Sequence, residues 1–86
     1  MPEVSRFFGM VIAMYFDDHP PPHFHVTHGD DRAQMRIDPP GLLNGALSPR
    51  ALALVVEWAA LHRSELLTNW DRVQARRAAT RIEPLR

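Results

Sequence analysis

The hydrophobic pattern of the chain changes its period once, at Ser48–Pro49. Before this point, residues 23–28 (HFHVTH) and 32–38 (RAQMRID) alternate apolar with polar side chains, which is typical of half-buried strands. After it, apolar residues recur every three or four positions, which predicts an amphipathic helix. Strands followed by a helix indicate an α+β fold. We expect the helix to cover one face of an antiparallel sheet and to leave the face of His23 and His25 free.

Turn residues divide the first half of the chain into strands. The segment FFGMVIAMYF (7–16) is apolar on both faces and predicts a central strand. The residues HGDD (28–31) predict a tight turn that joins the two alternating segments into a hairpin. GLLNGAL (41–47) adds either a short strand or an irregular loop, and RIEPL (81–85) adds either a final strand or an extended arm. The sequence therefore predicts a small antiparallel sheet of about three to four strands.

One long or broken C-terminal helix follows the strands. Ser48 is a favourable N-cap, and Pro49 occupies the first helical position, where its missing N–H has no effect on the helix. The helical pattern continues to about Arg77, which is long for a helix in a chain of 86 residues. A break near His62 is the alternative, with Ser64 as a second cap.

The composition fits one small soluble domain over residues 1–86. With 45% apolar and 23% charged residues, the chain is neither disordered nor fibrous, and a domain of this size buries roughly 60–65% of its unfolded surface. The absence of cysteine excludes disulfide scaffolds, thiol nucleophiles and thiolate metal sites, and it fits a cytoplasmic location. The longest apolar run has ten residues and is too short to span a bilayer, so we expect no membrane association.

A histidine-rich segment is the strongest functional signal, because four of the five histidines fall within ten residues. On a strand, His23 and His25 share one face at a spacing of roughly 6–7 Å, and two such imidazoles can bind one metal ion. His19 or a carboxylate of Asp17 or Asp18 would supply a third ligand. Histidine with carboxylate suits zinc, nickel or non-haem iron. The alternative is a pair of exposed histidines without a physiological metal.

Without a metal, the same histidines can act as acid and base. An imidazole titrates near pH ~6.5, so that His23 and His25 can transfer a proton between them. Arg36 on the neighbouring strand would stabilise a phosphate, and Tyr15 would position the substrate, as in a metal-independent ribonuclease. The plainer alternatives are a cross-strand ion pair for Arg36 and a strand-end aromatic ring for Tyr15.

The helical half carries candidate partner-binding residues. Trp58 is expected either at the edge of the apolar stripe or partly exposed, where it would contact a partner. Arg72, Arg76 and Arg77 form a basic helix end, which either interacts favourably with the helix C-terminus or contacts nucleic acid. The total charge is zero, but the two halves of the chain carry −3 and +3. Such a dipolar chain is suited to a polar partner or to a homodimer.

Three segments resemble the domain-of-unknown-function family 4160 of small bacterial proteins. HPPPHFHV (19–26) is close to the His-x-Pro-Pro-His-Phe-His-Val signature of that family, and EWAALHR (57–63) and NW (69–70) support the resemblance. It implies a stand-alone cytoplasmic bacterial domain with no established activity, and a cognate small protein encoded nearby, as in toxin–antitoxin modules. The leading hypothesis is thus a protein-binding module of a two-gene regulatory or toxin–antitoxin-like pair. The alternative is a small His-dependent hydrolase, ribonuclease-like or metal-dependent, that uses residues 19–25.

Overall fold

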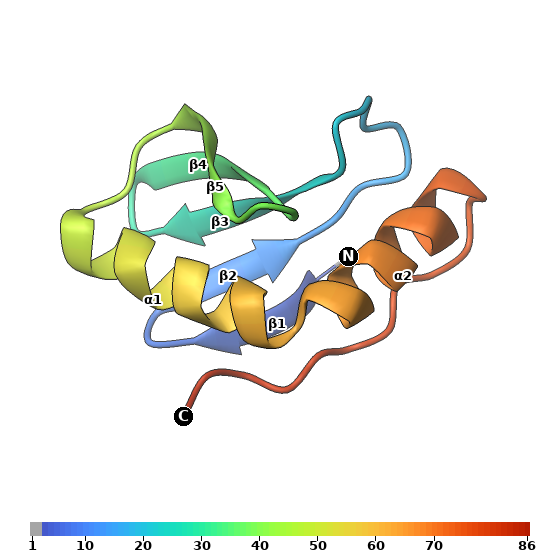
Figure 1. Cartoon of the computed structure of the whole chain (residues 1–86). Helices are drawn as coiled ribbons and strands as arrows, with labels where there is room; N and C mark the ends of the chain where they lie inside the picture. The colour runs from blue at the N-terminus through green and yellow to red at the C-terminus, as the bar shows by residue number, and fades with distance from the viewer. Residues whose placement is uncertain (1–2) are drawn as a thin grey trace.

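A computed structural model describes residues 3–86 as a sheet with helices across one face (Figure 1). The α+β class and the antiparallel sheet are confirmed, but within the described range the sheet has five strands rather than three to four, in the order β1-β2-β3-β4-β5. Two helices lie end to end in front of it. The elements are β1 (Glu3–Phe7), β2 (Met10–Ala13), β3 (His23–His28), β4 (Asp31–Arg36), β5 (Gly41–Gly45), α1 (Pro49–Leu61) and α2 (Arg63–Gln74).

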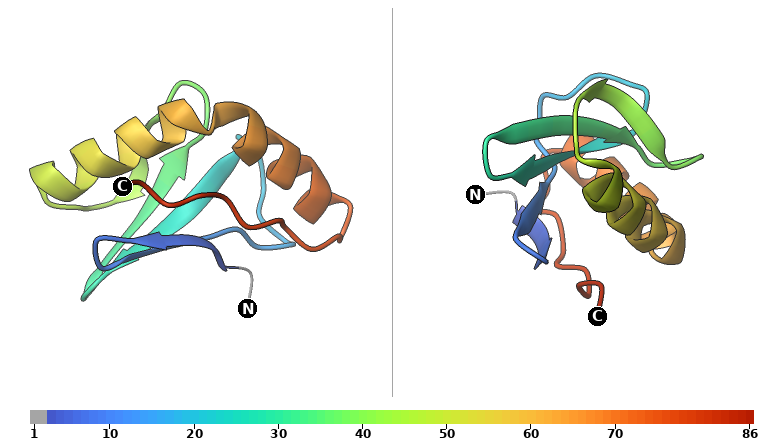
Figure 2. Two further views of the ribbon diagram at one scale, coloured as in Figure 1. Left: turned by 90° about the horizontal axis from the view of Figure 1, so that it is seen from below. Right: turned by 90° about the vertical axis from the view of Figure 1, so that its left-hand side faces the viewer.

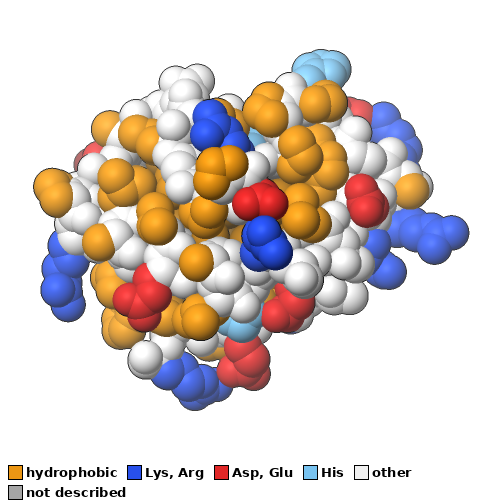
Figure 3. Space-filling model, in the orientation of Figure 1, with side chains coloured by type: hydrophobic (Ala, Val, Ile, Leu, Met, Phe, Trp, Pro, Cys, Tyr) orange, Lys and Arg blue, Asp and Glu red, His pale blue; other side chains and the backbone are white. Residues whose placement is uncertain are grey.

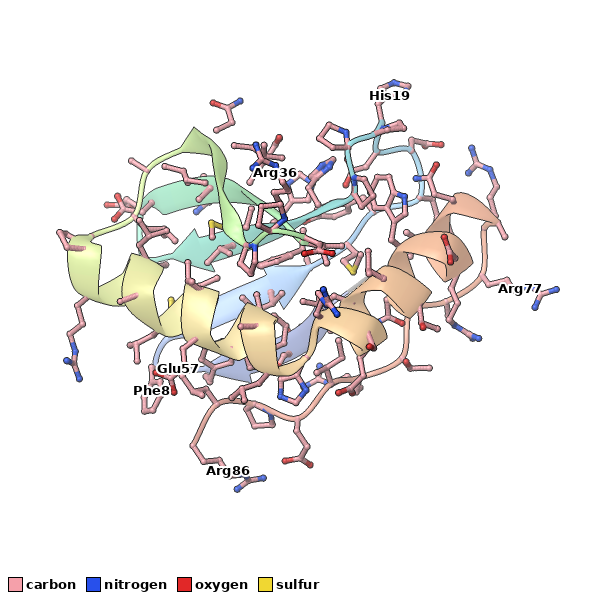
Figure 4. The ribbon with its side chains drawn as sticks, viewed as in Figure 1. Phe8, His19, Arg36, Glu57, Arg77 and Arg86 are labelled. Atoms are coloured by element: carbon pink, nitrogen blue, oxygen red, sulfur yellow. The ribbon has the colours of Figure 1, made fainter. Side chains whose placement is uncertain are left out.

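The prediction of a single strand over residues 7–16 is wrong, because the segment takes part in a hairpin. Phe8 and Gly9 adopt φ values of 48° and 76°. Two successive positive φ values make the tight turn that matches the twist of an antiparallel pair, and Phe7 accordingly pairs with Met10 across it. The apolar run hides the turn because phenylalanine rarely adopts a positive φ. The Phe8 side chain is left exposed at the tip of the hairpin (Figure 4).

The predicted hairpin of residues 23–28 and 32–38 is confirmed. His28 of β3 pairs with Asp31 of β4 across a two-residue turn. The inward residues of both strands join the core, as their alternation predicted: Phe24, Val26, Ala33, Met35 and Ile37. The short-strand alternative for residues 41–47 is also realised, as β5, and the five strands curve around α1 (Figure 2).

The start of the helical region is as predicted, and its middle is broken. The Ser48 hydroxyl accepts a hydrogen bond from the Ala51 N–H at 3.2 Å. The break lies at His62, which joins α1 to α2. Ser64 is not a cap, because α2 already begins at Arg63 and has no side-chain cap. Within residues 3–86, neither helix is long and apolar enough to cross a membrane.

The α2 helix ends at Gln74, before the predicted limit at Arg77. Arg76 adopts a φ of 60°, which turns the chain out of the helix. The Arg77 N–H then donates to the Arg72 carbonyl at 2.8 Å, the hydrogen bond of a Schellman-type helix end. Arg76 and Arg77 therefore lie on a turn beyond the helix and do not extend its surface.

Trp58 lies at the centre of the core and is fully buried, which corrects the expectation that it would be partly exposed. Its ring packs against Phe7 and Phe24, with ring centroids 5.3 and 5.8 Å away. The indole N–H donates to the Glu83 carbonyl at 2.8 Å, which gives this buried polar group the partner it needs. Trp58 is therefore unavailable to a binding partner, and it joins helix, sheet and C-terminal segment.

We call the C-terminal residues 75–86 the tail. Of the two alternatives for residues 81–85, the extended arm is realised. The tail runs between the helices and β1 (Figure 2). Ile82 is buried, and its N–H donates to the Val4 carbonyl at 2.8 Å. The buried Asn69 side chain donates to the Thr80 carbonyl and accepts from the Thr80 N–H, at 2.8 and 2.9 Å. These bonds fix the tail to both layers of the fold.

Glu3 ties the first strand to the tail. Its carboxylate lies 2.7 Å from Arg6 Nη2 and 2.8 Å from Arg81 Nη1. The hydrogen bonds from Arg6 and then from Arg81 lower the pKa of Glu3 from 4.5 to about 2. A carboxylate with a depressed pKa stabilises the folded state above the ordinary value and loses this effect as the pH falls through the folded value.

We expect Glu3→Gln to destabilise the protein at pH 7 and the difference from wild type to disappear between pH 4.5 and about 2. Urea unfolding followed by tryptophan fluorescence at several pH values measures this difference. Glu57→Gln is the matched control, since Glu57 has no ion pair within residues 3–86 and lies in solvent (Figure 4). A Glu3→Gln difference that is independent of pH would contradict the expectation.

We expect Asn69→Ala to lower the free energy of unfolding by about 1–3 kcal/mol, because it removes the two hydrogen bonds that the buried Asn69 side chain makes with the backbone of Thr80. Thr80→Val is the control, since it removes only the hydroxyl bond to Asn69 and keeps both backbone bonds. Urea denaturation of both variants provides the comparison. Equal effects would show that the backbone bonds to Asn69 contribute little.

Candidate metal centre

The histidine-rich segment reaches the sheet through a loop, residues 14–22, that rises beside the end of α2 (Figure 1). The loop contains three consecutive prolines, whose rings fix φ and stiffen the chain. Gln74 of α2 donates from Nε2 to the Asp18 carbonyl at 2.8 Å, and Arg76 pairs with Asp17. The loop is thus fixed to the helix just before the chain enters β3 at His23.

Asp18, His23 and His25 bring one oxygen and two nitrogens together. Asp18 Oδ2 lies 2.7 Å from His25 Nε2 and 3.5 Å from His23 Nε2. The three ligand atoms all lie within 4.8 Å of one another. The side chains are 20%, 8% and 23% exposed for Asp18, His23 and His25. The cluster is therefore partly shielded but remains open to solvent beside His25.

The backbone sets the tautomer of His23. Its Nδ1 lies 2.8 Å from the Pro21 carbonyl oxygen, which can only accept, so Nδ1 carries a proton. In neutral His23, Nε2 then directs a lone pair toward the Asp18 carboxylate, which also offers only lone pairs. This contact is favourable only when a cation, either a proton or a metal ion, lies between the two atoms. Histidine ligands of metals typically donate their other N–H to a backbone carbonyl in this way.

One pair of ligand atoms, from His23 and Asp18, already has the spacing that a tetrahedral ion needs. Bonds of ~2.1 Å place neighbouring ligand atoms about 3.4 Å apart, close to the observed 3.5 Å between His23 and Asp18. The contact of His25 with Asp18 has to lengthen by about 0.7 Å, so that metal bonds replace the present hydrogen bond. Three protein ligands leave a fourth position open, which is the arrangement of catalytic zinc sites and not of structural ones.

Two aromatic rings flank the cluster. Tyr15 packs edge-on against His25, with ring centroids 4.7 Å apart, and Trp70 of α2 lies 5.4 Å from the His23 ring. Trp70 covers His23, which is 6% exposed, so the expectation that the whole His23/His25 face is free is wrong. The sequence did not indicate this cover, because no local spacing reveals a contact between β3 and α2.

Arg36 lies directly opposite His23 in the register of β3 and β4. Its side chain therefore shares a face of the sheet with His23 and His25. A shallow groove of about 240 Å³ extends from Tyr15 and His25 over the same side. The structure therefore brings together four candidates predicted as catalytic, which are Tyr15, His23, His25 and, from the neighbouring strand, Arg36.

A second and larger groove, of about 560 Å³, reaches Asp18 from the other side of Tyr15. Its apolar lining includes the exposed rings of Tyr15 and Phe16. Both residues were predicted to end the strand of residues 7–16. Ala78 and Ala79 of the tail complete its wall. Tyr15 thus separates two grooves, and both lead to the cluster.

Two of the predicted metal ligands lie outside the cluster. His19 is exposed at the tip of the loop and points away from the rest of the molecule (Figure 4). Asp17 is 81% exposed and forms an ion pair with Arg76. Asp18 is the carboxylate that the loop turns toward the histidines, a choice that the sequence left open.

The predicted basic helix end is not a single patch. Arg72 donates from Nε to the Ala78 carbonyl at 2.7 Å, and Arg76 is paired with Asp17. Arg77 projects into solvent away from the cluster (Figure 4). On the helical side of the molecule, basic, acidic and apolar side chains are interspersed (Figure 3). The arginines of α2 and the tail therefore serve mainly intramolecular contacts.

Comparison with known families gives one match. The model of the family described as Domain of unknown function (DUF4160) matches residues 9–71. This span is most of the chain and contains Asp18, His23 and His25, whereas β1 and the tail lie outside it. Neither the curated proteins nor the solved structures give a match to the chain.

Proposed function

This chain belongs to the domain-of-unknown-function family DUF4160, and we propose that it is a small metal-dependent hydrolase whose divalent ion is bound by Asp18, His23 and His25. The observation that carries the proposal is the approach of two Nε2 atoms to one carboxylate oxygen, at 2.7 and 3.5 Å. A divalent cation would replace the proton of the His25–Asp18 hydrogen bond and accept a lone pair from each of the three ligand atoms. Zinc suits two imidazoles and one carboxylate at this spacing, with nickel and iron as the alternatives.

The surroundings of the cluster support hydrolysis of a phosphoester. A bound divalent ion supplies an activated water and polarises a phosphoryl oxygen. Arg36 forms no ion pair within residues 3–86, so its guanidinium is available to the phosphate oxygens. Tyr15 restricts the His25 ring and borders the opening, while Trp70 excludes water from the side of His23.

We expect isothermal titration calorimetry to measure one zinc ion per chain of EDTA-stripped protein. Asp18→Asn and His25→Asn each remove a direct ligand. Each should therefore weaken zinc binding by more than the ~10–100-fold that is typical for loss of a residue that only hydrogen-bonds a ligand. His19→Asn is the matched control, since this histidine lies outside the cluster. Binding should also weaken as the pH falls, because protons compete for the ligand atoms.

The hydrolase assignment is tested on the same proteins with bis(p-nitrophenyl) phosphate as the substrate. We expect the zinc-loaded wild type and His19→Asn to release nitrophenol, and Asp18→Asn to be inactive. Zinc binding without hydrolysis would retain the site and reject the enzyme. Hydrolysis that persists in EDTA and is lost only in His25→Asn would assign acid–base chemistry to the histidines instead.

A second candidate function is a protein-binding module that docks a cognate small protein encoded nearby. The groove of about 560 Å³ supports it, because Tyr15 and Phe16 are 40% and 42% exposed there. Exposed aromatic residues in a concave surface are typical anchors of protein interfaces. The carboxylates of Asp17 and Asp18 on its rim favour a partner segment with a basic residue next to an apolar one.

We expect Phe16→Ser to abolish co-purification of the co-expressed neighbouring gene product with the tagged protein, because the substitution removes an apolar anchor. Leu61→Ser is the matched control, since Leu61 is 67% exposed but does not line this groove. Retention of the partner by Phe16→Ser, or its loss from both variants, would place the docking surface elsewhere.

A further inference from the structure

The outer side of β3, β4 and β5 presents polar side chains in alternate rungs of the sheet. Thr27 pairs with Arg32 in one rung and His25 with Gln34 in another, with the pair of Val26 and Ala33 between them. Asn44 of β5 continues the second rung beyond Gln34. These side chains line the groove of about 240 Å³ that begins at Tyr15 and His25, a surface that we call the sheet groove.

The charge of the sheet groove is positive, although the whole chain is neutral. No carboxylate of residues 3–86 lines it. Arg32 lines it and donates to the backbone carbonyls of Gly29 and Asp31, at 3.3 and 3.4 Å. Arg36 lies on the same face of the sheet, opposite His23 and outside the lining of the groove. Neither arginine forms an ion pair in the described part of the chain. Two unneutralised guanidinium groups on one face favour an anionic ligand with oxygens at more than one position.

The shape of the sheet groove favours an extended ligand. Its volume of about 240 Å³ is below the ~300–1,000 Å³ of pockets that enclose a small molecule. One end of the groove lies at the cluster of Asp18, His23 and His25, where Tyr15 is 40% exposed beside His25. A polymer that crosses the rungs can therefore place one of its linkages at Asp18, His23 and His25.

We propose that the sheet groove binds single-stranded RNA and delivers its phosphodiester to the cluster, an inference that rests on the proposed hydrolase function. Arg32 and Arg36 contact backbone phosphates, and Tyr15 offers a face on which an unstacked base packs. The hydroxyl of Thr27 and the amides of Gln34 and Asn44 supply donors and acceptors for base edges and for the 2′-hydroxyl. An exposed aromatic ring beside an open sheet face offers stacking to single strands, whose bases are accessible, and not to duplexes.

The test is fluorescence anisotropy with a fluorescein-labelled uridine oligonucleotide, the full chain and EDTA, so that binding is measured without hydrolysis. Two phosphate contacts predict a slope of log K against log salt of about −1.4, since each contributes about −0.7 on a single strand. Arg32→Gln and Arg36→Gln should each reduce the slope by about half. Tyr15→Leu should weaken binding about tenfold by removing the stacking surface.

Arg50→Gln is the matched control, because Arg50 is exposed and lies in the first turn of α1, away from the sheet groove. The inference is overturned if the oligonucleotide does not bind, or if Arg50→Gln changes the slope as much as Arg36→Gln. Equal affinity for an RNA duplex or for polyglutamate would overturn it as well, because neither offers accessible bases.

The same measurement separates this inference from the hydrolase proposal. RNA binding with no zinc binding in calorimetry would reject the hydrolase and retain the surface. Zinc binding and phosphoester hydrolysis with no RNA binding would reject the surface and retain the hydrolase.

Discussion

Trp58 packs against Phe7 and Phe24 of the sheet and donates its indole N–H to the Glu83 carbonyl of the tail. A single buried side chain therefore joins α1, the sheet and the tail. The rest of the structure depends on this contact, because it fixes the distance between the layers and so the path of α2. That path packs the Trp70 ring against the His23 ring, and it lets the Gln74 amide donate a hydrogen bond to the backbone carbonyl of Asp18.

The candidate site lies where three independently fixed elements meet. The histidines come from a strand inside the sheet, the carboxylate comes from a proline-stiffened loop, and an aromatic cover comes from α2. Each ligand is held by contacts outside the cluster, such as that of His23 with the Pro21 carbonyl. These contacts bring the donor atoms together before an ion binds. The side chains therefore lose little conformational entropy when an ion binds.

Local periodicity explains which parts of the fold could be predicted. The alternation in β3 and β4 identified their hairpin and their inward faces, and Ser48 with Pro49 identified the helix start. The β1–β2 hairpin was missed, because its turn uses a positive φ at Phe8 inside an apolar run.

In the candidate site, too, features set by local spacing could be predicted, and features set by tertiary packing could not. The shared face of His23 and His25 follows from their spacing, which is local. The choice of Asp18 over His19 depends on the direction of a proline-rich loop, and the cover by Trp70 depends on tertiary packing. Neither can be obtained from spacing along the chain.

The position of the tail also affects how the sheet meets other chains. An antiparallel sheet has two edges with unpaired backbone groups, and such edges promote pairing between molecules. The Ile82 N–H donates a hydrogen bond to the Val4 carbonyl at the β1 edge, and the tail covers this side of the molecule. The other edge, β5, begins and ends with glycine and follows a register irregularity in β4, features that discourage addition of a further strand. The fold therefore protects itself at both edges against growth into larger sheets, so that a small and curved sheet can keep its outer face open to ligands.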